Sequence, residues 1–79
     1  MLNDRRENVR HVVNRAAKLQ ESPTVRECTI RDISSTGVKL VVPRGIASEQ
    51  FTLFDGEAIE HQCLVIWRLG DLVGARFVK

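Results

Sequence analysis

The sequence predicts an all-β protein, either a barrel or a sandwich, built from six short strands. Runs rich in β-branched and other apolar residues follow one another at close spacing along the 79 residues, which is typical of strands. Gly, Pro and Asp-Gly separate these runs, and such residues mark tight turns. We favour a barrel in a chain this small, because closure removes exposed strand edges.

The length predicts one domain with a small core. Residues 1–10 are polar and follow neither a strand nor a helix period. We therefore expect a flexible N-terminal arm over residues 1–10 and the β-barrel domain over residues 11–79. No apolar run approaches the ~20 residues of a membrane span, and the charged N-terminus has no apolar stretch of a signal peptide behind it. We therefore expect a cytoplasmic protein that does not insert into a membrane.

Turn residues and alternation place the individual strands. The first strand is the least regular, and a helix over residues 8–20 competes with it because several apolar positions partly fit a 3.6-residue period. The chain ends after the last strand, without room for a C-terminal helix. The expected strands cover residues 11–21, 25–33, 37–42, 51–55, 58–69 and 72–78.

Alternation along these strands predicts the core. In residues 58–69 both faces become apolar toward the middle, so we expect this strand to be central and buried there. The same alternation directs Trp67 and Phe77 inward, as core residues rather than ligand platforms. Cys28 and Cys63 match no zinc motif and make no disulfide framework, so we expect two buried free thiols.

Positive charge is concentrated near the N-terminus. Five basic side chains, against two acidic ones, fall within the first twenty residues, and such a concentration can attract an anion. Arg6 and Arg10 form an R-x-x-x-R pattern there. The alternative is a solvated basic tail. A chain this rich in arginine can contain the R-x-x-x-R pattern by chance.

A second cluster lies between two expected strands. Asp32, Ser34 and Gly37 form a D-x-S-x-x-G pattern, although these residue types are also ordinary turn formers. If the arm folds back over the barrel, its arginines meet this turn. Arginine pairs with phosphate oxygens and with the O6 and N7 edge of guanine, while Asp32 complements the guanine N–H donors. These residues together suit a ligand that carries phosphate and guanine.

On these two motifs the sequence resembles the PilZ domain, a bacterial receptor module for cyclic di-GMP. The resemblance extends over residues 28–40 and to the segments 65–68 and 73–77, which are similar to stand-alone α-proteobacterial members. It implies a six-stranded antiparallel barrel whose arm wraps around the ligand. The implied ligand-binding residues are Arg5, Arg6, Arg10, Asp32, Ser34 and Gly37.

The resemblance also bears on stoichiometry and output. The residue before the first motif arginine is Arg5, which favours a pair of ligands because another guanidinium can stack on a second guanine. Val9 stands where many members have proline, so we expect a more flexible arm. The implied function is a receptor that orders its arm on binding and signals to a downstream protein.

Two other functions compete with the receptor. One is a PilZ-fold adaptor that binds protein and no nucleotide. The other is an RNA- or DNA-binding barrel, which the lack of a paired aromatic platform argues against. We expect no enzyme and no cofactor or metal, since His11 and His61 have no companions with metal-ligand spacing. His11 beside the motif, and the exposed Arg68 and Arg76, are expected chiefly to be solvated.

Overall fold

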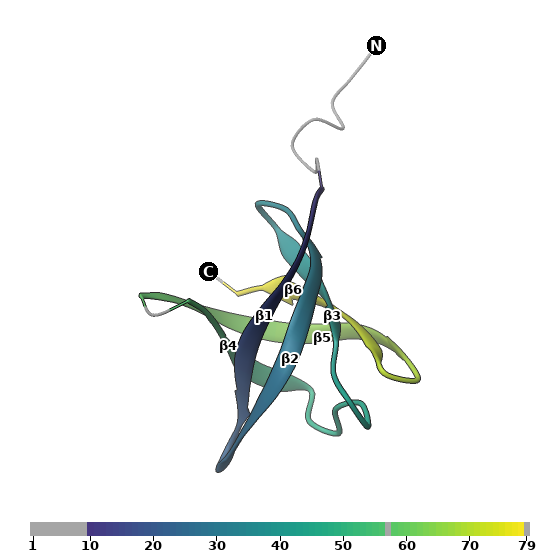
Figure 1. The fold of residues 1–79 in the computed structure, drawn as a ribbon. Helices are drawn as coiled ribbons and strands as arrows, with labels where there is room; N and C mark the ends of the chain where they lie inside the picture. Colours follow the sequence, from purple (N-terminus) through teal and green to yellow (C-terminus); the bar gives the residue numbers. More distant parts are fainter. Residues whose placement is uncertain (1–9, 57, 79) are drawn as a thin grey trace.

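The chain forms a closed barrel of antiparallel strands. A computed structural model describes residues 10–56 and 58–78, and the order around the barrel is β1-β2-β3-β6-β5-β4 (Figure 1). The strands are β1 (His11–Glu21), β2 (Thr24–Ile33), β3 (Gly37–Val41), β4 (Gln50–Asp55), β5 (Ile59–Leu69) and β6 (Leu72–Phe77). The predicted all-β fold is confirmed, and no helix occurs within the described residues.

Two predictions about the start of the chain have different outcomes. The competing helix is wrong over its described part, because β1 pairs with β2 from His11 to Glu21. The predicted arm lies almost wholly in residues 1–9, outside the described residues, and so do Arg5 and Arg6. Nothing in the described chain is a helix long and apolar enough to cross a membrane.

The core follows the alternation of the sequence over most of the barrel. Val38 and Leu40 of β3 face inward while Lys39 between them faces outward, as predicted. Large side chains from all six strands and the loop after β3 fill the interior. The fully buried ones are Leu19, Ile30, Leu40, Leu53, Val42, Val73 and Cys63.

Both cysteines are buried free thiols, as predicted. Burial raises the pKa of Cys28 to about 11 and that of Cys63 to about 12. The two thiols therefore remain protonated and act as small apolar side chains in the core.

The prediction that β5 is buried on both faces toward its middle is wrong. Cys63 is its only buried residue, while Ile66 and Leu69 are largely exposed. A β-bulge lies between Val65 and Trp67, where the register with β6 shifts. The bulge ends the simple alternation, so the apolar end of β5 faces outward instead of lying in a buried sheet.

The barrel closes through a short contact between β1 and β4. Backbone pairing joins only Lys18–Gln20 to 52–54. Beyond it, Arg15 Nε and Nη2 donate to the two carboxylate oxygens of Asp55 at 2.9 and 2.6 Å. This bidentate ion pair continues the seam where the backbone hydrogen bonds stop.

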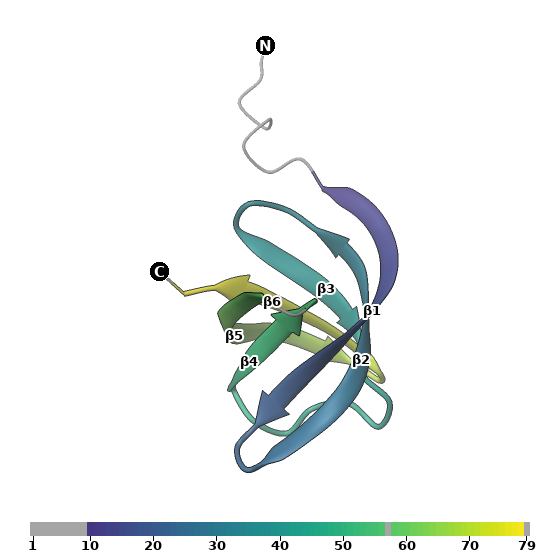
Figure 2. The same ribbon diagram turned by 60° about the vertical axis from the view of Figure 1, so that its left-hand side comes forward.

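Several segments distant in sequence meet at one end of the barrel. The start of β1, the β2–β3 turn and the end of β6 lie together there (Figures 1 and 2). The Phe77 N–H donates to the Thr36 carbonyl at 2.9 Å and ties β6 to that turn. Arg10, the one described arginine of the first predicted motif, and the turn motif therefore lie at this end of the molecule.

Candidate functional site

A β-bulge directs Asp32 toward the outer wall of the barrel. Ile30 pairs with the inward-facing Leu40, but Asp32 pairs with the outward-facing Lys39, because Arg31 is an extra residue in β2. Simple alternation from Ile30 would have turned Asp32 into the core. Bulges commonly re-aim a side chain in this way.

Asp32 holds two cationic side chains. Arg10 Nη1 donates to Asp32 Oδ1 at 2.7 Å, and Lys39 Nζ lies 3.5 Å from Asp32 Oδ2. Asp32 is only 7% exposed, whereas the Arg10 side chain is 58% exposed. The guanidinium of Arg10 therefore keeps N–H donors available on its solvent side while the carboxylate fixes its position.

Ser34 and Gly37 build the turn that follows β2. Ser34 Oγ accepts hydrogen bonds from the N–H groups of Thr36 and Gly37, each at 3.2 Å. A Cβ on Gly37 would lie 2.5 Å from the carbonyl oxygen of Ala75, a distance that no side chain tolerates. The residue types at both positions are thus explained by the turn and by the close approach of β3 to β6.

A hollow of about 200 Å³ opens on the outer face of β3, β6 and β5. Gly37 and Gly74 are outward-facing positions of its lining that carry no side chain. The indole of Trp67, which also lines the hollow, occupies the space above Gly74. Three of the predicted residues, Arg10, Ser34 and Gly37, line it. The full lining is Arg10, Ser34, Thr36, Gly37, Val38, Lys39, Ile66, Trp67, Gly74, Ala75 and Arg76.

Trp67 lies in this hollow and not in the core. The β5 bulge places Trp67 opposite Gly74, and the residue is 40% exposed. The prediction of an inward Trp67 is wrong for that reason, whereas Phe77 does pack partly buried against the core. An accessible indole beside cationic groups is suited to stacking on a nucleobase.

Two arginines that looked alike in the sequence have different roles. Arg68 Nε and Nη2 donate to the carbonyls of Ile46 and Ser48 at 3.0 and 2.9 Å, so Arg68 anchors the β3–β4 loop. Arg76 lines the hollow instead. The candidate site thus gains four residues that the sequence motifs did not include: Lys39, Trp67, Gly74 and Arg76. The one sequence signal that could have pointed to them was Gly74, a glycine inside a strand.

The histidines lie apart from the hollow. His11 is exposed and does not line it. His61 stacks on Phe77, with ring centroids 4.2 Å apart, and the pair borders a different hollow of about 400 Å³ below the β2–β3 turn. Neither imidazole therefore belongs to the candidate site.

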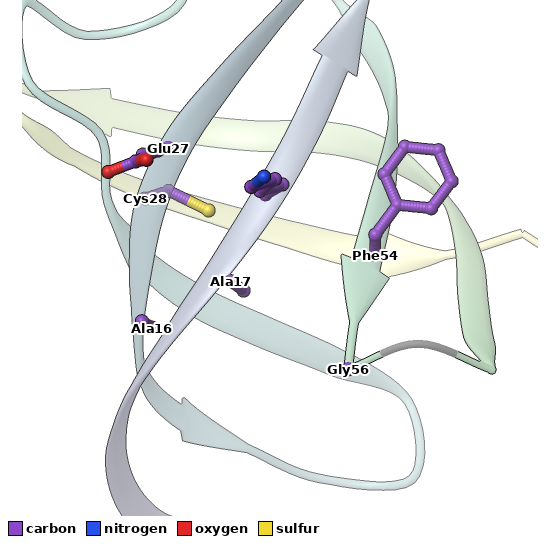
Figure 3. A pocket seen from close by; sticks show the side chains of 7 residues that line it. Ala16, Ala17, Glu27, Cys28, Phe54 and Gly56 are labelled. Carbon is purple, nitrogen blue, oxygen red and sulfur yellow. The ribbon is translucent and has the colours of Figure 1, made fainter.

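A more apolar hollow of about 370 Å³ opens between β1 and β4 (Figure 3). Ala16, Ala17 and Phe54 line it, and Cys28 lies at its inner side. None of the four predicted ligand-binding residues that the structure describes, Arg10, Asp32, Ser34 and Gly37, lines this space. Its chemistry does not suit an anion as the first hollow does.

A small barrel with a cationic hollow and an accessible indole has the chemistry to bind an anionic ligand with an aromatic ring system. The family model of the PilZ domain matches residues 4–79. The chain therefore belongs to the PilZ domain family, whose members are binding modules associated with cyclic di-GMP. No curated protein matches the sequence.

Proposed function

We propose that this protein is a cyclic di-GMP receptor that binds the dinucleotide in the hollow on β3, β6 and β5. The observation that carries the proposal is the position of Arg10. It is held by Asp32 at 2.7 Å and lines the same hollow as the accessible indole of Trp67. Phosphate and guanine are the groups that such a pair recognises.

Each group in the site has a role in this binding mode. Arg10 donates to a phosphate oxygen or to the guanine O6 and N7 edge, and Trp67 stacks on a guanine ring. Asp32 holds Arg10 in position. A carboxylate accepts about four hydrogen bonds in all, so Asp32 can also accept from a guanine N–H.

Arg5 and Arg6 complete the proposed ligand set from the arm. Arg6 supplies the first arginine of the R-x-x-x-R motif, and Arg5 recruits a second ligand by stacking on its guanine. Ordering of the arm over the occupied hollow changes the surface around Ile66 and Trp67. A downstream protein that reads this surface receives the signal.

Isothermal titration with cyclic di-GMP tests the proposal. We expect micromolar or tighter binding by the wild-type chain, and a loss of about 10-fold or more in Arg10→Ala and Arg6→Ala, because each removes a charge-assisted contact. Arg31→Ala is the matched control, since Arg31 is exposed and does not line the hollow. Cyclic di-AMP, which lacks the guanine edge, should bind more weakly.

The outcomes separate the receptor from its alternative. Two nucleotides per chain would support the role of Arg5, and Arg5→Ala should then reduce the ratio to one. If the wild-type chain neither releases heat nor gains thermal stability with the nucleotide, the receptor is excluded. The protein would then be a PilZ-fold adaptor.

A further inference from the structure

Two cationic residues of the hollow, Lys39 and Arg76, belong neither to the R-x-x-x-R motif nor to the D-x-S-x-x-G motif. In the pairing of β3 with β6, Gly37 lies opposite Arg76 and Lys39 lies opposite Gly74. Lys39 and Arg76 are therefore diagonal neighbours on the outer face, within reach of one another's long side chains. Both line the hollow together with Gly37 and Gly74, and the indole of Trp67 occupies the space above Gly74.

The charges around the hollow do not balance. Arg10, Lys39 and Arg76 bring three positive charges, against the single carboxylate of Asp32 that contacts the first two. Within residues 10–56 and 58–78, Arg76 has no salt-bridge partner. Counted over the described residues, the hollow thus carries an excess of two positive charges on one wall of the barrel, which attracts an anion.

Arg68 shows what an arginine with a structural task looks like on the neighbouring strand β5, where it pairs with the inward-facing Val73. Its guanidinium is already used by the carbonyls of Ile46 and Ser48. Arg76 makes no such bond within the described chain. Its guanidinium is therefore available to a ligand, in a way that the guanidinium of Arg68 is not.

We infer that Lys39 and Arg76 form a second phosphate subsite on the barrel wall, separate from Arg10 and the arm. This inference rests on the proposed function. Cyclic di-GMP carries two phosphodiester groups, each with one negative charge, and the excess charge of the hollow matches this dianion. Arg10 and the arm take one phosphodiester, and Lys39 with Arg76 takes the other, with the indole of Trp67 between Gly74 of β6 and the bound base.

The subsite makes a specific demand on the ligand. A mononucleotide such as cyclic GMP has only one phosphodiester and cannot fill both positions. Removing the subsite should therefore reduce the preference for cyclic di-GMP over cyclic GMP. Loss of a merely structural residue would weaken both ligands alike.

The test compares Lys39→Met and Arg76→Met with wild type by titration of cyclic di-GMP and cyclic GMP. Lys18→Met is the matched control, because Lys18 is an exposed strand lysine that lines the hollow between β1 and β4 instead. Each titration is repeated between about 0.05 and about 0.3 M salt, because the Debye screening length shortens markedly over this range. Lys39→Arg and Arg76→Lys keep the charge, and a thermal melt checks that each variant is folded.

We expect Lys39→Met and Arg76→Met each to weaken cyclic di-GMP binding about 10-fold or more. We also expect a smaller loss for cyclic GMP and a weaker salt dependence, while Lys18→Met behaves as wild type. If wild type binds and both Met variants match it, the subsite is excluded and the receptor stands. If both ligands weaken equally, or if the charge-keeping variants fail as the Met variants do, the two residues are structural. A wild-type chain that does not bind cyclic di-GMP overturns the receptor and the subsite together.

Discussion

The indole of Trp67 covers Gly74 on the neighbouring strand. A Cβ built on Gly74 would lie 2.2 Å from both Nε1 and Cε2 of that indole. The ring therefore occupies the space that a side chain on β6 would need. Since Lys39 pairs with Gly74 from the other side, Trp67, Gly74 and Lys39 lie in one row across β5, β6 and β3.

Gly74→Ala should displace the indole and weaken the site. The added methyl group overpacks this contact, and we expect a loss of about 1–3 kcal/mol in the free energy of unfolding. The three heavy atoms nearest to the added methyl group all belong to the Trp67 side chain. Trp67→Ala should therefore remove the steric clash. Urea denaturation of both single variants and the double variant measures the coupling between them.

The double variant decides the interpretation. Gly74→Ala made in the Trp67→Ala background should cost almost nothing in stability. An equal cost in both backgrounds would mean that the backbone of β6 rejects the methyl group. The indole would then not be what requires glycine at this position.

Trp67 should report ligand binding directly. It is the only tryptophan of the chain and is partly exposed in the hollow, so a stacked guanine should quench its fluorescence. Trp67→Phe should keep much of the affinity, whereas Trp67→Ala should lose it by roughly 10-fold or more, in line with the ~1–3 kcal/mol of a base–aromatic stack. Unchanged emission at saturating cyclic di-GMP would place the guanines away from the indole.

Alternation along the strands was sufficient to predict most of the fold, and its failures have one physical cause. Val38 and Leu40 obey it, and so does Cys63. Asp32 and Trp67 do not, because each follows a bulge that shifts the register by one residue. A bulge depends on how two strands pair, and a single strand's sequence does not specify it.

The candidate site shows the same division between local and long-range information. Ser34 and Gly37 could be placed in a turn from their residue types alone. The difference between Arg68 and Arg76 could not, because it depends on the β3–β4 loop, which supplies carbonyl acceptors to Arg68 only. The turn motif therefore lies at the candidate site, and the pairing of β5, β6 and β3 adds Trp67, Gly74 and Arg76 to it.

Ser34→Ala should act on the turn before it acts on the ligand. Two backbone N–H groups lose their acceptor, Ser34 Oγ. We expect a loss of about 1–2 kcal/mol in the free energy of unfolding without any nucleotide present. Thermal or urea melts of the ligand-free variant measure it. Wild-type stability together with reduced affinity would instead assign the hydroxyl to the ligand alone.

The two thiols should resist modification in the folded protein. Burial raises the pKa of Cys28 to about 11 and that of Cys63 to about 12, and the thiolate is the reactive form. An aromatic disulfide reagent near pH 8 should react with neither until denaturant is added. Ser35→Cys, at an exposed turn position, supplies a reactive control. Rapid modification of native Cys28 would show that the hollow between β1 and β4 opens widely enough to admit the reagent.

The ion pair between Arg15 and Asp55 should make the β1–β4 seam sensitive to acid. The hydrogen bond from Arg15 holds the pKa of Asp55 below its ordinary value, against the opposing effect of burial. The unfolded chain therefore takes up a proton more readily at Asp55 than the folded chain does. The stabilisation is fully present above the unfolded pKa of about 4 and is lost as the pH falls through the lower folded pKa.

Asp55→Asn tests this linkage. The variant should be less stable than wild type at neutral pH, because Arg15 loses its ionic partner where β1 and β4 have no backbone pairing. The difference between the two proteins should shrink as the pH falls below about 4, since acid removes the same charge from wild type. Glu60→Gln is the matched control, because Glu60 is exposed and has no salt bridge within the described residues. A stability difference that is independent of pH would show that Asp55 supports the seam through its shape and hydrogen bonding, and that its charge contributes nothing.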